Sequence, residues 1–152
     1  MKMKVVDLFC GCGGLSLGFQ KAGYEVLAAF DNWDEAVMVY HNNFVHPVIK
    51  QDLSDVETTV EEIKNFNPDM IIGGPPCQDL SSAGKRNEDN GRGDLTVHYA
   101  QIVSSIKPEW FVMENVDRIL KTGKLVEARR ILKESGYGLT ETVLNASFCG
   151  VP

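Results

Sequence analysis

The sequence predicts a doubly wound α/β fold with a mostly parallel sheet, and three observations carry this prediction. Short apolar runs alternate along the chain with segments whose apolar residues recur at helical spacing. The turns between them are short, and several apolar runs end at a glycine or an aspartate. No repeat, linker or low-complexity segment interrupts the pattern, so the 152 residues are expected to form one domain, 1–152.

The first half of the chain contains three strand and helix pairs. Each predicted strand is an apolar run that leads into a polar or glycine-rich turn, and each predicted helix has apolar residues three and four positions apart. The strands are residues 5–9, 25–30 and 48–49, and the helices that follow them are residues 15–22, 34–44 and 57–66.

The second half continues the alternation after a long loop. Pro68 opens a fourth strand through Met70-Ile71-Ile72, and residues 73–93 form a polar, glycine-rich loop of a length that is usually functional or mobile. A helix at 95–106, a strand at 108–113 and a helix at 123–135 capped by Gly136 come next. Residues 138–144 alternate polar and apolar side chains, which predicts a final strand.

The composition is that of a globular protein in a reducing compartment. Hydrophobic residues make up 43% and charged residues 24%, and no apolar run approaches the roughly 20 residues that cross a bilayer. Asp7 interrupts the N-terminal apolar run, which argues against a secretion signal. The four cysteines are therefore expected to be reduced thiols in a cytoplasmic protein. Cys10 and Cys12 are too closely spaced for a zinc site, so no metal is expected.

The formal net charge of −6 bears on possible nucleic-acid partners. Phosphate contacts normally require a basic surface, and this chain has no block of Lys and Arg. Any contact with DNA or RNA must come from a local group of basic residues, or from another polypeptide segment or subunit.

Cys77 is the strongest single indication of chemistry. It follows a buried strand directly, in the stiff sequence Gly73-Gly74-Pro75-Pro76-Cys77-Gln78. Ligands of open α/β sheets bind beyond the carboxyl ends of the strands, so a thiol held there is a candidate nucleophile. Glu114 and Asn115 end the next strand, which can bring a carboxyl group to the same crevice. A lone cysteine is more often an inert core residue, but the flanking Pro-Pro and Gln are not well explained that way.

The ends of the first three strands together suggest a cofactor site. Ser16 replaces the third glycine of a dinucleotide fingerprint, which disfavours NAD. The remaining glycine turn opens a helix and can hold a carboxylate, Asp31 can accept from ribose hydroxyls, and Trp33 can stack on a purine. Asp52 can accept from an adenine amino group. Each feature alone is more often a cap, a turn or packing, but their succession fits S-adenosyl-L-methionine.

Three sequence segments in this order resemble conserved motifs of the DNA (cytosine-5) methyltransferases. They are residues 7–14 (Asp-Leu-Phe-Cys-Gly-Cys-Gly-Gly), residues 75–78 (Pro-Pro-Cys-Gln) and residues 114–116 (Glu-Asn-Val), which look like the first, fourth and sixth motifs. Residues 145–152 resemble the start of the eighth, so the resemblance spans essentially the whole chain. It implies a Rossmann-like methyltransferase domain and a role in DNA methylation within a restriction-modification system, in the cytoplasm of a bacterial or archaeal cell.

The resemblance implies a role for each matched position. Cys77 would attack carbon 6 of cytosine, and Glu114 would hold and protonate ring nitrogen 3. Residues that would bind S-adenosylmethionine are Phe9, Gly11, Cys12, Gly13, Gly14, Asp31, Asn32, Trp33, Asp52, Leu53, Pro75 and Leu95. Residues that would contact a flipped-out cytosine and its DNA strand are Pro76, Gln78, Ser81, Lys85, Arg86, Arg92 and Asn115. The alternative for the basic residues among these is a solvated surface patch.

The resemblance stops before the family's target-recognition region and its C-terminal helix. We therefore expect this chain to be inactive alone and to need a complementary C-terminal subunit or portion. Two alternatives remain open at this point: a non-catalytic S-adenosylmethionine-binding remnant, and a methyltransferase that acts on cytosine in RNA.

Overall fold

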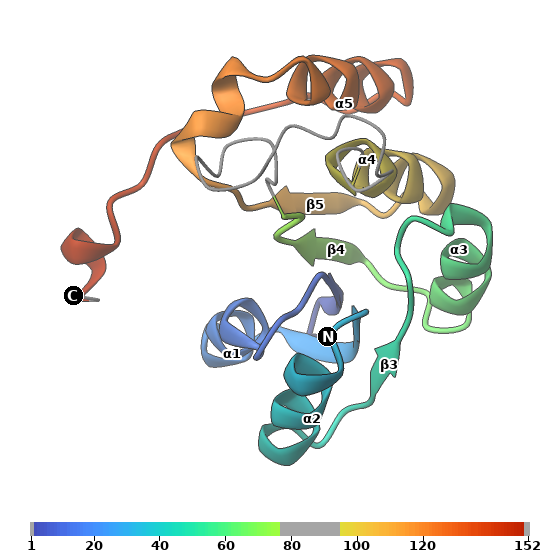
Figure 1. The fold of residues 1–152 in the computed structure, drawn as a ribbon, viewed down its shortest axis with the longest axis vertical. Coiled ribbons are helices and arrows are strands. Elements are labelled where there is room, and N and C mark those ends of the chain that lie inside the picture. Colours follow the sequence, from blue (N-terminus) through green and yellow to red (C-terminus); the bar gives the residue numbers. More distant parts are fainter. Residues whose placement is uncertain (1, 77–94, 151–152) are drawn as a thin grey trace.

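A computed structural model describes residues 2–76 and 95–150 of the chain. Figure 1 shows strands and helices alternating along the sequence. The strands are β1 (Lys4–Leu8), β2 (Glu25–Asp31), β3 (Val48–Lys50), β4 (Met70–Gly73) and β5 (Trp110–Met113). The α-helices are α1 (Gly14–Lys21), α2 (Asp34–Asn43), α3 (Val56–Lys64), α4 (Leu95–Ile106) and α5 (Gly123–Glu134), and two short 3-10 helices are η3 (Asp117–Lys121) and η4 (Ala146–Cys149).

The five strands form one parallel sheet in the order β3-β2-β1-β4-β5. The chain first moves outward from β1 to β2 and β3, and then returns to the other side of β1 with β4 and β5. This reversal is the doubly wound arrangement that the alternating pattern predicts, and the fold prediction is confirmed. It also creates a switch point between β1 and β4, where ligands of such sheets usually bind.

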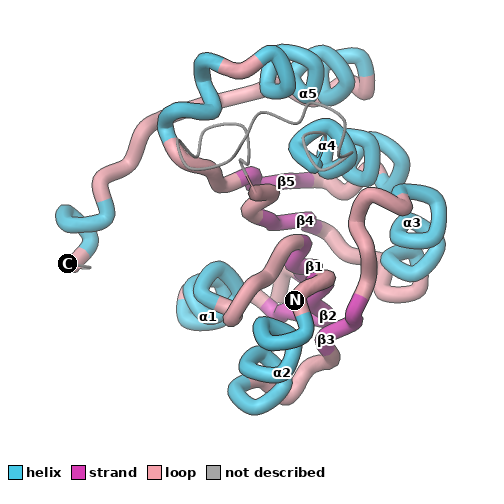
Figure 2. Tube along the Cα trace, viewed as in Figure 1, coloured by secondary structure: helices cyan, strands magenta, loops and turns pink. Residues whose placement is uncertain are grey.

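Helices cover both faces of the sheet (Figure 2). The larger core lies on the side of α3, α4 and α5, where Val6, Leu8 and Phe30 point from the sheet into a cluster with helix residues such as Ile102. Alternate residues point to the opposite side, because successive side chains of a strand leave opposite faces. There Val5, Val26, Met70 and Ile72 pack against α1, and Ala29 packs against Tyr40 of α2.

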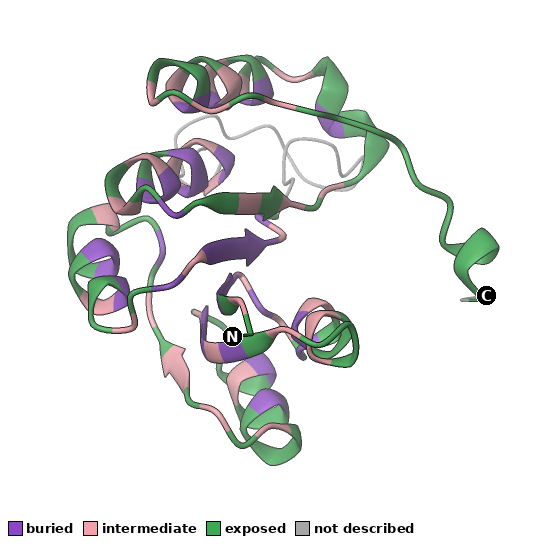
Figure 3. Cartoon of the chain, turned by 180° about the vertical axis from the view of Figure 1, so that it is seen from behind, coloured by how far each residue is buried: buried purple, intermediate pink, exposed green. Residues whose placement is uncertain are grey.

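The second face is only partly covered at the β5 end. Figure 3 shows β4 buried throughout while much of β5 is exposed. Phe111 and Met113 pack into the larger core, so Trp110 and Val112 lie on the α1 side of the sheet. They are 54% and 39% exposed.

The predicted final strand at 138–144 is wrong. Residues 138–145 have no strand assignment and leave the body of the protein as an exposed arm that ends in η4 (Figure 3). Val143 and Leu144 are 71% and 80% exposed, and the attachments of this arm include Leu139 against the core and the Glu141 carboxylate paired with Arg129. An alternating pattern favours a strand, but a strand also needs a neighbour to pair with. Among the described residues, no strand lies beside residues 138–144.

Candidate functional site at the ends of β1, β2, β4 and β5

The strands β1 and β4 end side by side at the switch point. Leu8 is paired with Gly73, and a Cβ atom on Gly73 would lie 2.5 Å from the Leu8 carbonyl oxygen and 2.9 Å from the Tyr99 ring. Real Cβ atoms do not approach backbone so closely, so a glycine is required here. The two strand exits are thereby brought into direct contact.

The turn after β1 is built on unusual backbone torsions. Phe9, Gly11 and Gly13 have φ angles of 57°, 51° and 93°. The Gly13 N–H donates to the Cys10 carbonyl at 2.9 Å, which closes the turn, and the next residue begins α1. The first N–H groups of a helix have no partner within it, and they lie at the positive end of the helix dipole. The Ser16 N–H bonds the buried Asp7 carboxyl, whereas Gly14, the first residue of α1, is exposed.

Asp31 joins the end of β2 to this turn. Its Oδ2 accepts from the Gly11 N–H at 2.8 Å and its Oδ1 accepts from the Trp33 N–H at 2.9 Å. Each carboxylate oxygen has a further lone pair, so the fixed carboxylate can still accept hydrogen bonds from a ligand. Trp33 is 62% exposed and Asn32 is exposed beside it. A rigid acceptor next to a free aromatic face suits a nucleoside.

Asp52 and Leu53, two predicted cofactor residues, follow the end of β3. Asp52 is exposed, and its Oδ1 accepts from the Ser54 N–H and hydroxyl at 3.0 and 2.7 Å. Leu53 is 2% exposed and packs in the larger core. The roles of Asp52 and Leu53 towards the cofactor stay predictions.

The cysteines of the glycine turn differ in environment. Cys10 is buried, and burial raises the pKa of its thiol well above the usual range, which leaves it protonated and unreactive. Cys12 is exposed. Among the residues that the structure describes, no group of three His, Cys, Asp or Glu could hold a metal ion.

A buried polar chain beneath the turn was not foreseen from the sequence. The Ser16 hydroxyl donates to Asp7 Oδ2 at 2.6 Å, the Tyr40 hydroxyl donates to Ser16 Oγ at 2.6 Å, and His46 Nε2 lies 2.6 Å from the Tyr40 hydroxyl. Asp7 is fully buried, and its Oδ1 has no partner among the described residues. Burial raises the pKa of Asp7 to about 7. The sequence signal was available: a charged residue inside an apolar parallel strand needs an explanation.

The exits of β4 and β5 lie against each other. The Glu114 N–H donates to the Gly73 carbonyl at 2.9 Å, and a Cβ atom on Gly74 would lie 3.1 Å from Glu114 Oε2. The Asn115 side chain donates to the Pro75 carbonyl at 2.7 Å. Pro75 is buried, while Pro76 and Glu114 are exposed. The carboxyl group of Glu114 therefore lies beside Gly74, where the chain leaves β4 and continues towards Cys77.

The remaining predicted residues are less informative. Leu95, at the start of α4, is partly buried. Six of the predicted residues lie outside the described ranges: Cys77, Gln78, Ser81, Lys85, Arg86 and Arg92. Within those ranges, no helix is both long and apolar enough to span a bilayer.

The fold and the strand-end residues define a Rossmann-like α/β protein with a candidate nucleotide-cofactor site at its switch point. The family model for C-5 cytosine-specific DNA methylase matches residues 3–152. The chain belongs to this family, as the sequence motifs predicted.

Similar proteins support the same assignment. The chain is 56% identical over 150 residues to the Type II methyltransferase M.HindV of Haemophilus influenzae, and 51% identical over 150 residues to M.HgiDI of Herpetosiphon aurantiacus. These alignments cover 99% of this chain but 49% and 48% of the relatives, so the chain spans about half of their length. The crystal structure of the S. pombe Dnmt2 methyltransferase matches the whole chain and 46% of that protein, with a TM-score of 0.81 and 21% identity, which shows the shared fold.

Proposed function

We propose that this chain is the cofactor-binding and catalytic portion of a DNA (cytosine-5) methyltransferase of a bacterial restriction-modification system, acting in the cytoplasm. Residues 1–152 would form one incomplete domain of that enzyme. The observation that carries the proposal is the convergence, at one switch point, of the Asp31-tied glycine turn, the β4 exit that leads to Cys77, and Glu114 at the β5 exit. Family membership supports the same chemistry.

The described residues fit S-adenosylmethionine. The exposed start of α1 offers N–H donors to the methionine carboxylate, the fixed Asp31 carboxylate offers acceptors to the ribose hydroxyls, and the exposed Trp33 ring offers a face to adenine. When bound, this cofactor supplies an activated methyl group. The chain's own contribution is to orient the cofactor towards the β4 and β5 exits.

Cys77 and Glu114 would make cytosine reactive. The thiolate of Cys77 adds to carbon 6, and the protonated Glu114 carboxyl gives its proton to ring nitrogen 3, so that the charge pushed into the ring is neutralised. Carbon 5 would thereby become the nucleophile that takes the methyl group, with S-adenosylhomocysteine as the leaving group. Loss of the carbon 5 proton to a base, with return of the nitrogen 3 proton to Glu114, would then re-form the bond between carbons 5 and 6 and expel the Cys77 thiolate. The base must leave the duplex to reach these groups.

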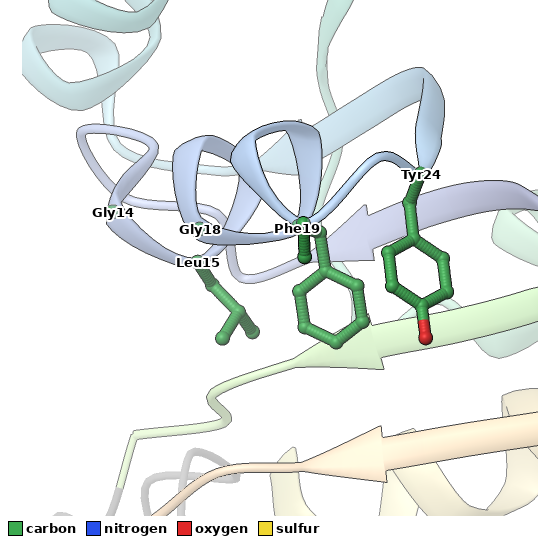
Figure 4. A pocket seen from close by; sticks show the side chains of 6 residues that line it. Gly14, Leu15, Gly18, Phe19 and Tyr24 are labelled. Atoms are coloured by element: carbon green, nitrogen blue, oxygen red, sulfur yellow. The ribbon is translucent and has the colours of Figure 1, made fainter. Parts of the chain in front are cut away.

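We also propose that a C-terminal portion, in the same polypeptide or as a separate subunit, covers the open face of the sheet. An apolar groove beside α1 is lined by Gly14, Leu15, Gly18, Phe19, Ala22 and Tyr24. Figure 4 shows Leu15, Phe19 and Tyr24 projecting from the α1 segment towards β4. The exposed Trp110 and Val112 lie on the same face. A chain that spans half the length of its relatives supports this choice of occupant.

Covalent trapping tests the proposed chemistry. This chain combined with its C-terminal portion is expected to form a stable adduct with DNA containing 5-fluorocytosine, in a cofactor-dependent manner, and to methylate ordinary cytosine DNA. Cys77→Ala should abolish the adduct, while Cys149→Ala, a control at an exposed thiol outside the proposed site, should leave most of it. Unchanged trapping by Cys77→Ala would remove Cys77 from its role. Cofactor binding without any adduct would identify a non-catalytic protein. Adduct formation with RNA but not with DNA would show that the substrate is RNA.

A further inference from the structure

The sequence after β4 lacks the backbone N–H groups that would continue hydrogen bonding to β5. The ladder between β4 and β5 continues to the bond from the Glu114 N–H to the Gly73 carbonyl. Two residues on, Pro75 and Pro76 have no N–H groups, so the backbone there cannot donate to a neighbouring strand. Pro75 is nevertheless buried, and its carbonyl oxygen still needs a donor.

Asn115 supplies the missing donor from its side chain. Its Nδ2 donates to the Pro75 carbonyl at 2.7 Å, and its Oδ1 accepts from the Val116 N–H at 2.9 Å. Both ends of the amide are therefore engaged within the protein. This arrangement suits a residue that holds two loops together better than one that reads a substrate, the role that the family resemblance implied for Asn115.

The contact between β4 and β5, here called the β4–β5 seam, is also held by side chains just before Pro75. The Tyr99 hydroxyl is fully buried between the strands and donates to the Ile71 carbonyl at 3.2 Å and the Val112 carbonyl at 3.0 Å. On the other side, Gly74 leaves room for the Glu114 carboxyl, whose Oε2 would lie 3.1 Å from a Cβ atom at position 74. Asn115 thus extends a rigid β4–β5 seam by two residues, up to the point from which the chain continues to Cys77.

We propose that Asn115 is a positioning residue, which fixes the Pro75 backbone relative to the Glu114 carboxyl and so sets the geometry between the nucleophile segment and the acid. This inference rests on the proposed function. Because Asn115 acts on the strand exits and not on the β1 and β2 subsites, its loss should slow covalent addition while leaving cofactor affinity intact.

Asn115→Asp and Asn115→Ala in the complete enzyme, with its C-terminal portion, test the inference. Aspartate has the size of asparagine but lacks the donor and places a carboxylate against the Pro75 carbonyl. Both variants are expected to slow trapping of 5-fluorocytosine DNA at saturating DNA by about tenfold or more. Their dissociation constants for S-adenosylmethionine and their KM for DNA should stay within about twofold of the wild type, which corresponds to only a few tenths of a kcal/mol.

Asn43→Ala is the matched control. Asn43 makes the same type of bond, from Nδ2 to the Val39 carbonyl at 2.7 Å, but on the exposed end of α2. It should trap at the wild-type rate. Melting temperatures of all variants separate a positioning defect from unfolding.

Three outcomes would overturn the inference. Wild-type trapping by Asn115→Asp would show that the donor is unnecessary. A raised KM for DNA with an unchanged saturated rate would assign Asn115 to substrate binding. A slow rate that follows the loss of folded protein would make the role merely structural. Absence of trapping by the wild type would instead defeat the proposed function, together with the inference that rests on it.

Discussion

At the scale of single residues, Asp7 shows how burial gives an ordinary side chain an unusual property. Its carboxyl lies under α1, where desolvation disfavours the charged form more than the Ser16 hydroxyl stabilises it. The pKa of this group therefore rises from 3.8 to about 7. Asp31, Cys10, Tyr40 and Tyr99 face the same region, and none of them brings a positive charge.

This shift predicts the pH dependence of stability. The folded state holds the Asp7 proton more tightly than the unfolded chain, so the free energy of unfolding should fall as pH rises from about 4 to about 7, and then level off. His46, whose pKa burial lowers, works in the opposite direction below about pH 6.5. Asp7→Asn keeps an acceptor for Ser16 and removes the titration of this group. The free energy of unfolding of the variant minus that of the wild type should therefore be more favourable at pH 8 than at pH 5.

Thermal or urea unfolding across this pH range measures the effect. Asp34→Asn is the control, because Asp34 is an exposed partner of Lys50 on the surface. It should retain the wild-type pH profile. The explanation fails if Asp7→Asn and the wild type change in parallel between pH 5 and pH 8.

At the scale of elements, the turn between β1 and α1 depends on one glycine far more than on its neighbour. A Cβ atom on Gly13 would lie 2.2 Å from the Phe44 ring and 3.0 Å from the Tyr40 ring, in a backbone with φ of 93°. Gly14 has nothing within 4 Å of the same atom. The two glycines look equivalent in the sequence, yet packing of α2 against the turn distinguishes them.

Gly13→Ala is expected to lower the free energy of unfolding by roughly 2–5 kcal/mol, because left-handed strain and overpacking add. It should also weaken S-adenosylmethionine binding, since the turn must shift away from Phe44. Gly14→Ala should be close to the wild type in stability, because a Cβ atom there meets no neighbour. Calorimetric titration of the cofactor and thermal unfolding check the pair, and equal behaviour of the two variants would contradict the packing argument.

The elements also show what sequence patterns can predict. Strand and helix alternation follows from periodicity that each segment carries within itself, and the order of β1 to β5 with their helices was predicted correctly. Residues 138–144 failed because a strand also needs a partner, which periodicity cannot reveal. The bond from Asn115 to Pro75 and the chain from Asp7 to His46 were missed for the same reason. Both join segments that are distant in sequence and meet only in the folded sheet.

At the scale of the whole molecule, the two faces of the sheet differ in how far the described residues cover them. The larger core is covered by α3, α4 and α5, whereas the α1 side carries the groove at Leu15 and Phe19 and the exposed Trp110 and Val112. The residues proposed to bind the cofactor include Trp33, which is exposed just beyond the end of β2. The two tryptophans of the chain therefore stand at the two surfaces proposed to receive partners.

Each tryptophan can report on one of these surfaces. With Trp33→Phe, the emission of Trp110 should shift to shorter wavelength when the C-terminal portion is added, and should change little with S-adenosylmethionine alone. With Trp110→Phe, cofactor should quench the emission of Trp33. Fluorescence titration measures both. An unshifted Trp110 in a complex shown to form by sedimentation would place the interface elsewhere.

The exposed side of β5 also restricts how a cell can make this protein. Among the described residues β5 is paired only with β4, so its other edge presents free N–H and C=O groups beside an apolar face. Such an edge is a template on which a second copy can pair, and aggregation follows. Where the proposed C-terminal portion is a separate subunit, expression of this chain in excess over it should therefore yield inclusion bodies, and matched synthesis of the two should yield soluble protein.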